Sequence, residues 1–443
     1  MVEQLGAQHA GPLSSGGPVR VCIFPSGSEI ALEVHRALAA SPHVAMLGAA
    51  SRTSNHGPYV FRDYVAGLPH VTEPDFLPAF NRVLEEYAID LVYPAHDDAL
   101  VVLTRETGKL AADVVASSAE TCAVCRSKRA TYERLAAHVP TPAIYNPDEA
   151  ALPFPVFLKP DASQGSKGVH IVYSRDELVF FCDRTSGLLA LEYLPGAEYT
   201  VDCFSDRHGR LRFVGPRERV RTVNGISTST HTVDPAPFIP MAEAIHAALP
   251  FRGGWFFQVK ARADGELVLM EAAPRVSGGM ALYRVLGVNF ALLSVYDRLG
   301  LDVEIRPIQA RAELDRALMN RFHLDITYRH VYIDLDDTVL SRDGGVNPFA
   351  LLFLHQCRRM GVPVYLLTRH TGAPQTALQR LGLESLFAAV HHVTDGACKS
   401  GFVTERDAIF IDDSFAERTR VHAATGVPCF AVDAIEALLD WRT

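Results

Sequence analysis

The order of apolar and polar residues over 19–125 predicts a parallel α/β domain. Short apolar runs predict strands, and amphipathic spacing predicts helices between them: strands at Val19–Phe24, Val44–Ala49 and Leu91–Pro94, helices at Glu29–Ala40 and Phe76–Tyr87. Because strands alternate with helices, the pattern favours a doubly wound parallel sheet.

Over 126–325 the pattern changes from alternation to a succession of strands. A helix at Ser127–His138 is ended by prolines, and another begins near Asp176. Strands are expected at Phe154–Lys159, Val169–Val172, Leu188–Tyr193, Glu198–Phe204, Leu211–Val214, Trp255–Ala261 and Leu267–Glu271. This succession favours an antiparallel or mixed α+β region. The charged stretch Arg311–Arg321 is interpreted as a helix-like connection.

Alternation resumes over 329–443 and predicts a second doubly wound α/β unit. The expected strands are His330–Leu335, Pro363–Thr368 and Ala408–Ile411, and the expected helices are Phe349–Met360, Pro374–Leu381 and Phe415–Ala424.

The composition is that of a globular protein whose partners are small molecules. The chain has 443 residues, 48% of them hydrophobic, and a formal net charge of -9. The negative balance argues against non-specific binding of nucleic acid. We expect no membrane partner, because no long apolar run is present.

The cysteines and the first residues lead us to expect a cytoplasmic protein. The eight cysteines are scattered through apolar segments, which favours reduced thiols. Cys122 and Cys125 form a lone C-x-x-C pair, and no nearby ligand completes a zinc site. Residues 1–18 are rich in Gly, Ser and Pro, lack the pattern of a signal peptide, and are expected to be a disordered lead-in.

A strand ending in Lys159 is followed by a loop rich in glycine and then by the strand Val169–Val172. The loop carries Ser163, Gln164, Gly165, Ser166, Lys167 and Gly168. Glycines let a backbone approach a polyphosphate closely, and loop N–H groups can form an anion site that the lysines reinforce. The alternative is an ordinary β-hairpin with a basic tip.

Residues 19–325 resemble the ATP-grasp superfamily. The motifs that carry the resemblance occur in order: Lys128, Lys159, the loop SQGSKG, Glu192-Tyr-Leu-Pro-Gly-Ala-Glu198, and Gln258–Gly279. The resemblance implies an N-terminal α/β domain (19–125) that precedes an ATP-grasp domain (126–325) of two α+β subdomains.

The same resemblance implies an ATP site. Lys128 and Lys159 would contact the ATP phosphates or the adenine edge, and the loop Ser163–Gly168 would cover the phosphates. Glu192, with the backbone of Tyr193 and Leu194, would read the adenine, and Glu198 would bind the ribose hydroxyls. The alternative for Glu192 and Glu198 is a pair of solvated loop charges.

Glu271 ends an apolar strand, where a carboxylate indicates a ligand. Mg2+, or Mn2+ in its place, prefers hard oxygen ligands, so Glu271, Gln258 and the ATP phosphates would satisfy it. Members of the superfamily usually carry Asn at the position of Ala273, which leaves the ligands of a second metal open.

The resemblance also implies a substrate site beyond the metal. Arg275 would stabilise the transferred phosphoryl group, and Ser277, Gly278 and Gly279 would offer N–H groups to a substrate carboxylate. Arg219 and Arg221 are candidate carboxylate clamps, since a guanidinium fits that shape. A solvated strand face is the alternative for these two arginines.

Residues 329–443 resemble the haloacid dehalogenase superfamily, a Rossmann-like fold. The motif Asp334-Leu-Asp336-Asp337-Thr338 follows an apolar strand, and Thr368, Lys399 and Asp412-Asp413 follow in order. In such a motif one carboxylate attacks phosphorus and the other transfers a proton.

The second resemblance implies a Mg2+-dependent phosphatase. Asp334 would be the nucleophile that forms an aspartyl phosphate, and Asp336 the general acid and base. Thr368 and Lys399 would bind the phosphoryl group. The side chains of Asp334, Asp412 and Asp413 and the backbone of Asp336 would hold the metal. The short gaps between these motifs leave no room for a cap domain.

The sequence therefore predicts a bifunctional enzyme, an ATP-dependent carboxylate-amine ligase fused to a capless phosphatase. Its expected partners are a carboxylate, an amine and a phosphorylated intermediate. Two alternatives stay open: an ATP-grasp small-molecule kinase, or a non-catalytic ATP-grasp module that regulates the phosphatase. Oligomeric state is also open, with a homodimer among the alternatives.

Overall fold

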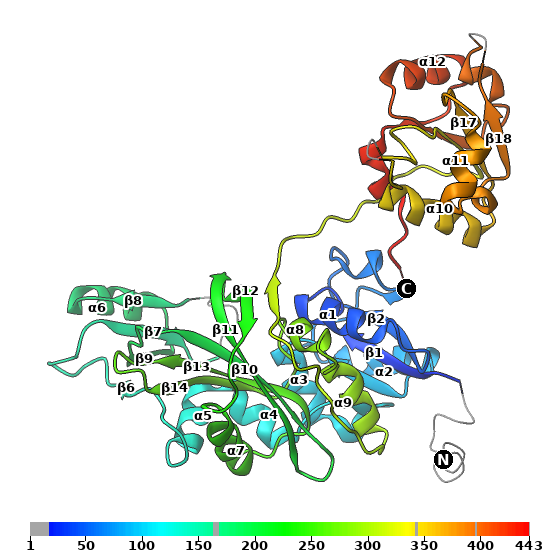
Figure 1. Ribbon diagram of the computed structural model, residues 1–443. Helices are drawn as coiled ribbons and strands as arrows, with labels where there is room; N and C mark the ends of the chain where they lie inside the picture. Colours follow the sequence, from blue (N-terminus) through cyan, green and yellow to red (C-terminus); the bar gives the residue numbers. More distant parts are fainter. Residues whose placement is uncertain (1–16, 163–167, 342–343, 395–396, 443) are drawn as a thin grey trace, which may run out of the picture. The chain divides into compact units, whose positions relative to one another are not determined.

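The computed structural model describes residues 17–162, 168–341, 344–394 and 397–442 (Figure 1). The chain divides into two compact units, with the boundary between Leu318 and Met319. Most of the expected lead-in (1–18) and most of the glycine loop (Ser163–Lys167) lie outside the described residues.

The first unit begins with a five-stranded parallel sheet in the order β3-β2-β1-β4-β5. Its strands are β1 Val19–Phe24, β2 Val44–Ala49, β3 Asp63–Val65, β4 Leu91–Pro94 and β5 Asp113–Val114, and its helices are α1 Glu29–Leu38, α2 Phe76–Glu86 and α3 Asp97–Arg105. This strand order places the topological switch point of the sheet between β1 and β4, where the connections that follow the two strands lead to opposite sides.

Alternation along β1 explains why both faces of this sheet are covered. Val21 and Ile23 are completely buried in a cluster that includes residues of α1 and α9, whereas Cys22 and Phe24 pack with residues of α2 and α3. Successive side chains of a strand point to opposite faces, so a continuously apolar strand needs helices on both sides.

Two further sheets complete the first unit. A four-stranded antiparallel sheet has the order β6-β9-β7-β8, and a six-stranded antiparallel sheet has the order β14-β13-β10-β11-β12-β15. Their elements are α4 Ala119–Arg126, α5 Lys128–Leu135, β6 Ile144–Tyr145, β7 Val156–Pro160, β8 His170–Val172, α6 Arg175–Arg184, β9 Leu188–Glu192, β10 Glu198–Ser205, β11 Leu211–Val223, β12 Ile226–Thr232, α7 Ile239–Ala248, β13 Gly253–Ala261, β14 Leu267–Ala273, α8 Ala281–Arg284, α9 Phe290–Arg298 and β15 Glu313–Asp315.

In each of these sheets, one face packs against helices and the other carries residues that line the functional site. Helices α5 and α7 lie beside the six-stranded sheet (Figure 1). Val201 and Phe257 pack in one cluster with residues of these helices, so the neighbouring residues Thr200 and Gln258 point to the other face. On the four-stranded sheet Leu158 packs with residues of α6, so Lys159 points away from that helix.

The second unit contains a five-stranded parallel sheet in the order β18-β17-β16-β19-β20. Its elements are β16 His330–Ile333, α10 Pro348–Met360, β17 Val364–Thr368, α11 Pro374–Leu381, β18 Ala389–His392, β19 Ala408–Ile411, α12 Phe415–Thr425 and β20 Cys429–Phe430. One apolar cluster joins the sheet to α10 and α11, and another joins it to α12.

The helix-like connection expected at Arg311–Arg321 is wrong. This stretch contains β15 and no helix among its residues, all of which the structure describes. β15 pairs with β12 through Ser229↔Asp315 and its neighbours, so the free edge of a sheet supplies backbone partners that a short isolated helix would have to make internally.

None of the helices in the described part of the chain has the length and apolarity that a membrane crossing requires. All eight cysteines lie within the described residues and are free thiols.

Candidate functional site

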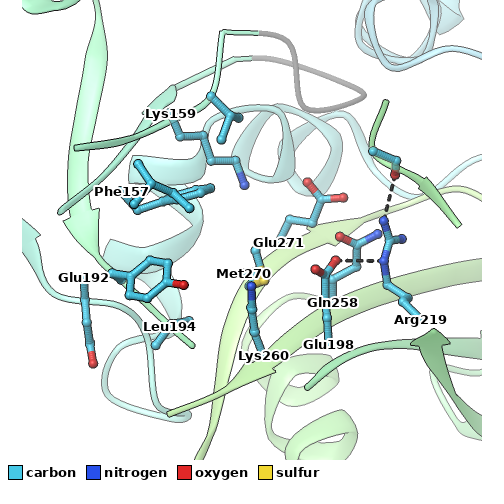
Figure 2. A pocket seen from close by; sticks show the side chains of 14 residues that line it. Phe157, Lys159, Glu192, Leu194, Glu198, Arg219, Gln258, Lys260, Met270 and Glu271 are labelled. Atoms are coloured by element: carbon cyan, nitrogen blue, oxygen red, sulfur yellow. Dashed lines mark hydrogen bonds and ion pairs between the residues drawn. The ribbon is translucent and has the colours of Figure 1, made fainter. Parts of the chain in front are cut away.

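A pocket of about 220 Å³ is lined by residues of the four-stranded and six-stranded sheets (Figure 2). Both sheets contribute to its wall, which consists of Phe157, Lys159, Val169, Ile171, Glu192, Tyr193, Leu194, Glu198, Arg219, Gly225, Gln258, Lys260, Met270 and Glu271. We call this cavity the inter-sheet pocket. Seven of these residues were expected from the sequence to bind ATP or the metal, and an eighth, Arg219, was expected to bind the substrate.

Lys159 is a buried cation that faces the pocket. It is 8% exposed, and among the described residues no hydrogen bond or ion pair engages its amine. Burial lowers the pKa of Lys159 to about 8, and the charge of Glu271 opposes that shift. Figure 2 shows the amine and the Glu271 carboxylate both pointing into the pocket. A buried, unpaired amine is suited to bind an anion.

Glu271 and Gln258 form a pair of oxygen donors on adjacent strands. They are direct cross-strand partners on β14 and β13, beside a register shift that follows Gln258. Cross-strand neighbours point to the same face of a sheet, so both oxygens are available to one cation. Ala273 pairs with Phe256 two residues farther on and offers no ligand atom.

The pocket has an apolar end formed by Phe157, Ile171, Leu194 and Met270. The amide of Leu194 has no protein acceptor among the described residues and is a free donor at this end. An apolar slot with a backbone donor has the chemistry that a purine base requires.

The carboxylate of Glu192 is already engaged. Arg262 Nε lies 2.7 Å from Glu192 Oε1, and the Ala143 amide donates to Oε2 at 3.3 Å. The hydrogen bonds from Arg262 lower the pKa of Glu192 despite partial burial. The side chain is therefore tied to Arg262, which follows β13, and to the loop before β6, and the Glu192 amide donates to the Ala143 carbonyl at 2.9 Å.

Glu198 and Arg219 form an ion pair at the opposite side of the pocket. Arg219 Nε lies 2.7 Å from Glu198 Oε1, and its Nη2 donates to the Gly225 carbonyl at 2.7 Å. The Arg219 side chain is only 6% exposed. Arg221, two residues farther along β11, instead pairs with Asp315 at 2.8 Å, and its side chain is 56% exposed.

The second cationic residue expected at the phosphates, Lys128, lies at the start of α5. It is 5% exposed and lines a smaller hollow with Glu271 and Arg275. Burial lowers the pKa of Lys128, and Glu271 opposes the shift. Ser127 caps the helix and also donates to Asp161 at 3.0 Å, which fixes the start of α5 against the end of β7.

Arg275 is held by Asp97, a residue of the N-terminal sheet region. Its guanidinium contacts both carboxylate oxygens, with Nη2 3.0 Å from Oδ2, and the two side chains are 12% and 19% exposed. Burial raises the pKa of Asp97, but Arg275 lowers it more, so the net shift is downward. The sequence analysis assigned no role to Asp97.

Ser277 belongs to a buried network that the sequence analysis also missed. Asp202 accepts from Ser277 Oγ at 2.6 Å and from Arg217 Nε at 2.8 Å. A Cβ on Gly279 would lie 2.6–2.8 Å from the Arg217 guanidinium, and one on Gly278 would collide with Glu29. The two glycines therefore allow this segment to pass close to Arg217 and to the start of α1.

The second unit has a charged cluster at the carboxyl ends of β16 and β19. Lys399 Nζ lies 2.5 Å from Asp334 Oδ1 and 2.7 Å from Asp412 Oδ2, and the three side chains are 6% exposed or less. Burial raises the pKa of Asp334 to about 7, with Lys399 opposing and Asp412 adding to the shift. β16 and β19 are parallel neighbours, so residues that follow them meet at one edge.

The carboxylates of Asp334, Asp412 and Asp413 could hold one cation, since an oxygen from each lies within 4.8 Å of the others. Thr338 Oγ1 accepts from the Asp413 amide at 3.1 Å and fixes the loop. His330, Glu405 and Asp407 form another such group, without any further sign of a ligand.

Asp336 and Thr368 lie at the same edge of the second sheet. His370 Nδ1 is 2.8 Å from Asp336 Oδ1, and the His370 amide donates to Thr368 Oγ1 at 3.0 Å. His370 thus joins the loops after β16 and β17. No sequence motif pointed to it.

The first comparison with known proteins concerns residues 184–321. They match the family model described as ATP-grasp in the biosynthetic pathway with Ter operon. This part of the chain is similar to the ATP-grasp superfamily. The match includes β10–β14 and therefore Glu198, Gln258 and Glu271. Because most of the match lies in the first unit, we call that unit the ATP-grasp unit. No curated protein matches the sequence.

Solved structures share the fold at low sequence identity. L-amino acid ligase from Bacillus licheniformis has a TM-score of 0.55 at 16% identity and covers 68% of this chain and 80% of its own. N5-carboxyaminoimidazole synthetase from Staphylococcus aureus has a TM-score of 0.54 at 14% identity, and the match covers 67% of this chain and 81% of the synthetase. The biotin carboxylase domain dimer of Hydrogenobacter thermophilus 2-oxoglutarate carboxylase, solved with MgADP and bicarbonate, has a TM-score of 0.54 at 14% identity, with 66% and 73% covered.

Proposed function

We propose that the ATP-grasp unit is an ATP- and Mg2+-dependent ligase that joins a carboxylate to an amine. The observation that carries this proposal is the inter-sheet pocket, in which Lys159, unpaired among the described residues, faces Glu271 and Gln258 next to an apolar slot. Similar folds in an amino acid ligase and in a structure with MgADP support it.

Different residues of the pocket would bind different parts of the nucleotide. The apolar end and the Leu194 amide would hold the adenine, Glu198 the ribose, and Lys159 with Lys128 the phosphates. Glu271 and Gln258 would hold Mg2+, which neutralises phosphate charge when bound. The donors present fit one metal ion, because Ala273 supplies no oxygen side chain for another.

The reaction would start with attack of a substrate carboxylate on the γ-phosphorus of ATP, which releases ADP. The amine would then attack the acyl phosphate and displace inorganic phosphate, leaving an amide. Arg275, fixed by Asp97, would stabilise charge on the transferred group. A kinase would stop after the first step, so dependence of ADP release on the amine separates the two functions.

For the second unit we propose a phosphatase, because Lys399 holds Asp334 and Asp412 together at the sheet edge. Asp334 would attack phosphorus and form an aspartyl phosphate while Asp336 protonates the leaving alkoxide. Water, deprotonated by Asp336, would then release phosphate. Asp334, Asp412 and Asp413 fit a Mg2+ ion, which would offset the phosphate charge.

The fusion suggests that the two reactions are consecutive, with the phosphatase removing a phosphomonoester from the ligase substrate or product. The partners proposed are thus a carboxylate, an amine and a phosphorylated intermediate.

The test measures ADP and phosphate release by the intact protein with MgATP and a panel of carboxylates and amines. Glu271→Ala is expected to abolish ADP release, whereas Asp334→Asn is expected to spare it and to abolish release of any additional phosphate. Release of ADP without need of an amine would support the kinase. Turnover of a phosphomonoester without any ADP release would support the non-catalytic ATP-grasp module.

A further inference from the structure

We infer that Arg219 is a positioning residue for Glu198 and thereby determines how tightly the pocket recognises the ribose of ATP. This inference rests on the proposed ATP site. It replaces the expectation that Arg219 clamps a substrate carboxylate.

The guanidinium of Arg219 is surrounded by protein atoms and only 6% exposed, so it is poorly placed to clamp a substrate carboxylate. Nε lies 2.7 Å from Glu198 Oε1 in an ion pair, although Nε makes no hydrogen bond within the described residues; Nη2 donates to the Gly225 carbonyl at 2.7 Å, and Nη1 donates to Thr200 Oγ1 at 3.4 Å. A bidentate clamp needs two adjacent N–H groups directed at one substrate, but here a protein oxygen lies beside each nitrogen.

These contacts join three parts of the pocket wall. Glu198 and Thr200 lie on β10, Arg219 on β11, and Gly225 in the turn between β11 and β12. Asn224 and Gly225 have φ angles of +51° and +75°, as a tight hairpin turn with Asn-Gly requires. The dashed lines in Figure 2 mark the ion pair of Arg219 with Glu198 and a hydrogen bond of Arg219 to another residue of the wall.

The arrangement leaves the second oxygen of Glu198 to accept from a ligand. Glu198 is also the direct cross-strand partner of Lys260 on β13, so it lies between cations on both neighbouring strands. An anionic acceptor held by an ion pair is oriented before the ligand arrives, and a carboxylate suits the two hydroxyls of a ribose.

Removal of Arg219 should therefore weaken recognition of the ribose and leave the rest of the nucleotide unaffected. The probe is 2′,3′-dideoxyATP, which keeps the base and the triphosphate but lacks both hydroxyls. A merely structural role of Arg219 would affect both nucleotides alike.

The experiment is calorimetric titration of the full-length protein with Mg2+ and either ATP or 2′,3′-dideoxyATP. Arg219→Gln is expected to weaken the binding of ATP about tenfold, because one charge-assisted contact is lost, and the binding of dideoxyATP less than about twofold. Glu198→Gln should give the same pattern, and the double variant should be no worse than either single variant. Arg212→Gln, on the same strand but exposed, is the matched control and should change neither affinity.

Arg219→Lys keeps the positive charge but cannot reach Glu198, Thr200 and the Gly225 carbonyl together. This variant should fold even if the glutamine variant does not, and it should reduce the affinity for ATP several-fold more than the affinity for dideoxyATP. Equal losses for both nucleotides, or no loss in either arginine variant, would overturn the inference. If the unchanged protein bound ATP and dideoxyATP equally, the ribose role would fail while the proposed ATP site stood, and if it bound neither, both would fail.

Discussion

Lys159 and Glu271 point into one pocket from two different sheets, and within the described residues neither side chain has a hydrogen-bond or ion-pair partner. Burial keeps the pKa of Lys159 near 8. Opposite charges that face one pocket without partners among the described residues are available to bind other groups. The polyphosphate and its metal ion are the groups that we propose.

The pKa of Lys159 predicts how ATP binding depends on pH. Phosphates bind the charged amine, so binding should take up a proton near pH 8 and the affinity for ATP should fall as pH rises through about 8. Titrations from pH 6.5 to 9.5 in buffers of different ionisation enthalpy measure both effects. Lys159→Gln should bind ATP at least about tenfold more weakly and lose the pH dependence.

Lys260→Gln is the control for this prediction, since Lys260 lines the same pocket from another sheet. It should retain the fall in affinity near pH 8. Identical pH profiles for the unchanged protein and Lys159→Gln would contradict the prediction.

Glu271→Gln should raise the Mg2+ concentration needed for ADP formation by about tenfold or more, because a neutral amide is a poorer ligand for a hard cation. The measurement is the initial rate at fixed ATP and increasing Mg2+. Glu266→Gln, in the exposed turn between β13 and β14, should keep the Mg2+ dependence of the unchanged protein. A dependence unaltered in Glu271→Gln would remove Glu271 from the metal site.

Lys399→Met should destabilise the second unit by about 3–5 kcal/mol, because it leaves the buried Asp334 and Asp412 carboxylates without their shared partner. Urea unfolding followed by fluorescence can isolate this unit in a Trp255→Phe background, where Trp441 is the remaining tryptophan. The matched control Arg420→Met removes an exposed partner of Glu417 and should cost less than about 1 kcal/mol. Equal losses in the two variants would argue against the buried cluster.

Asp97→Asn should slow ADP formation without weakening ATP binding, because Asp97 contacts Arg275 and not the wall of the inter-sheet pocket. Single-turnover rates and ATP affinities measured on the same sample separate the two effects. Asp98→Asn breaks a pair with Arg126, in which Asp98 is 45% exposed, and should leave the rate within about twofold. A parallel loss of affinity in Asp97→Asn would assign Asp97 to nucleotide binding instead.

The sequence by itself determined the strands and helices whose apolar periodicity is strong. β1, β2 and β4 coincide with the predicted runs, and β16, β17 and β19 differ from the predicted runs by at most two residues at an end. The sequence also predicted Glu271, because a carboxylate that ends an apolar strand indicates a ligand. Periodicity and residue type act locally, so a local pattern is enough to read them.

Only the tertiary structure decided which of these residues act together. The ion pairs Asp97–Arg275 and Glu198–Arg219, and the engagement of Glu192 by Arg262, join residues that are 178, 21 and 70 positions apart. The same holds for β15, whose few residues form a strand only because the edge of β12 is free. Charge pairing and strand addition depend on distances between segments, and those distances exist only after the sheets have packed.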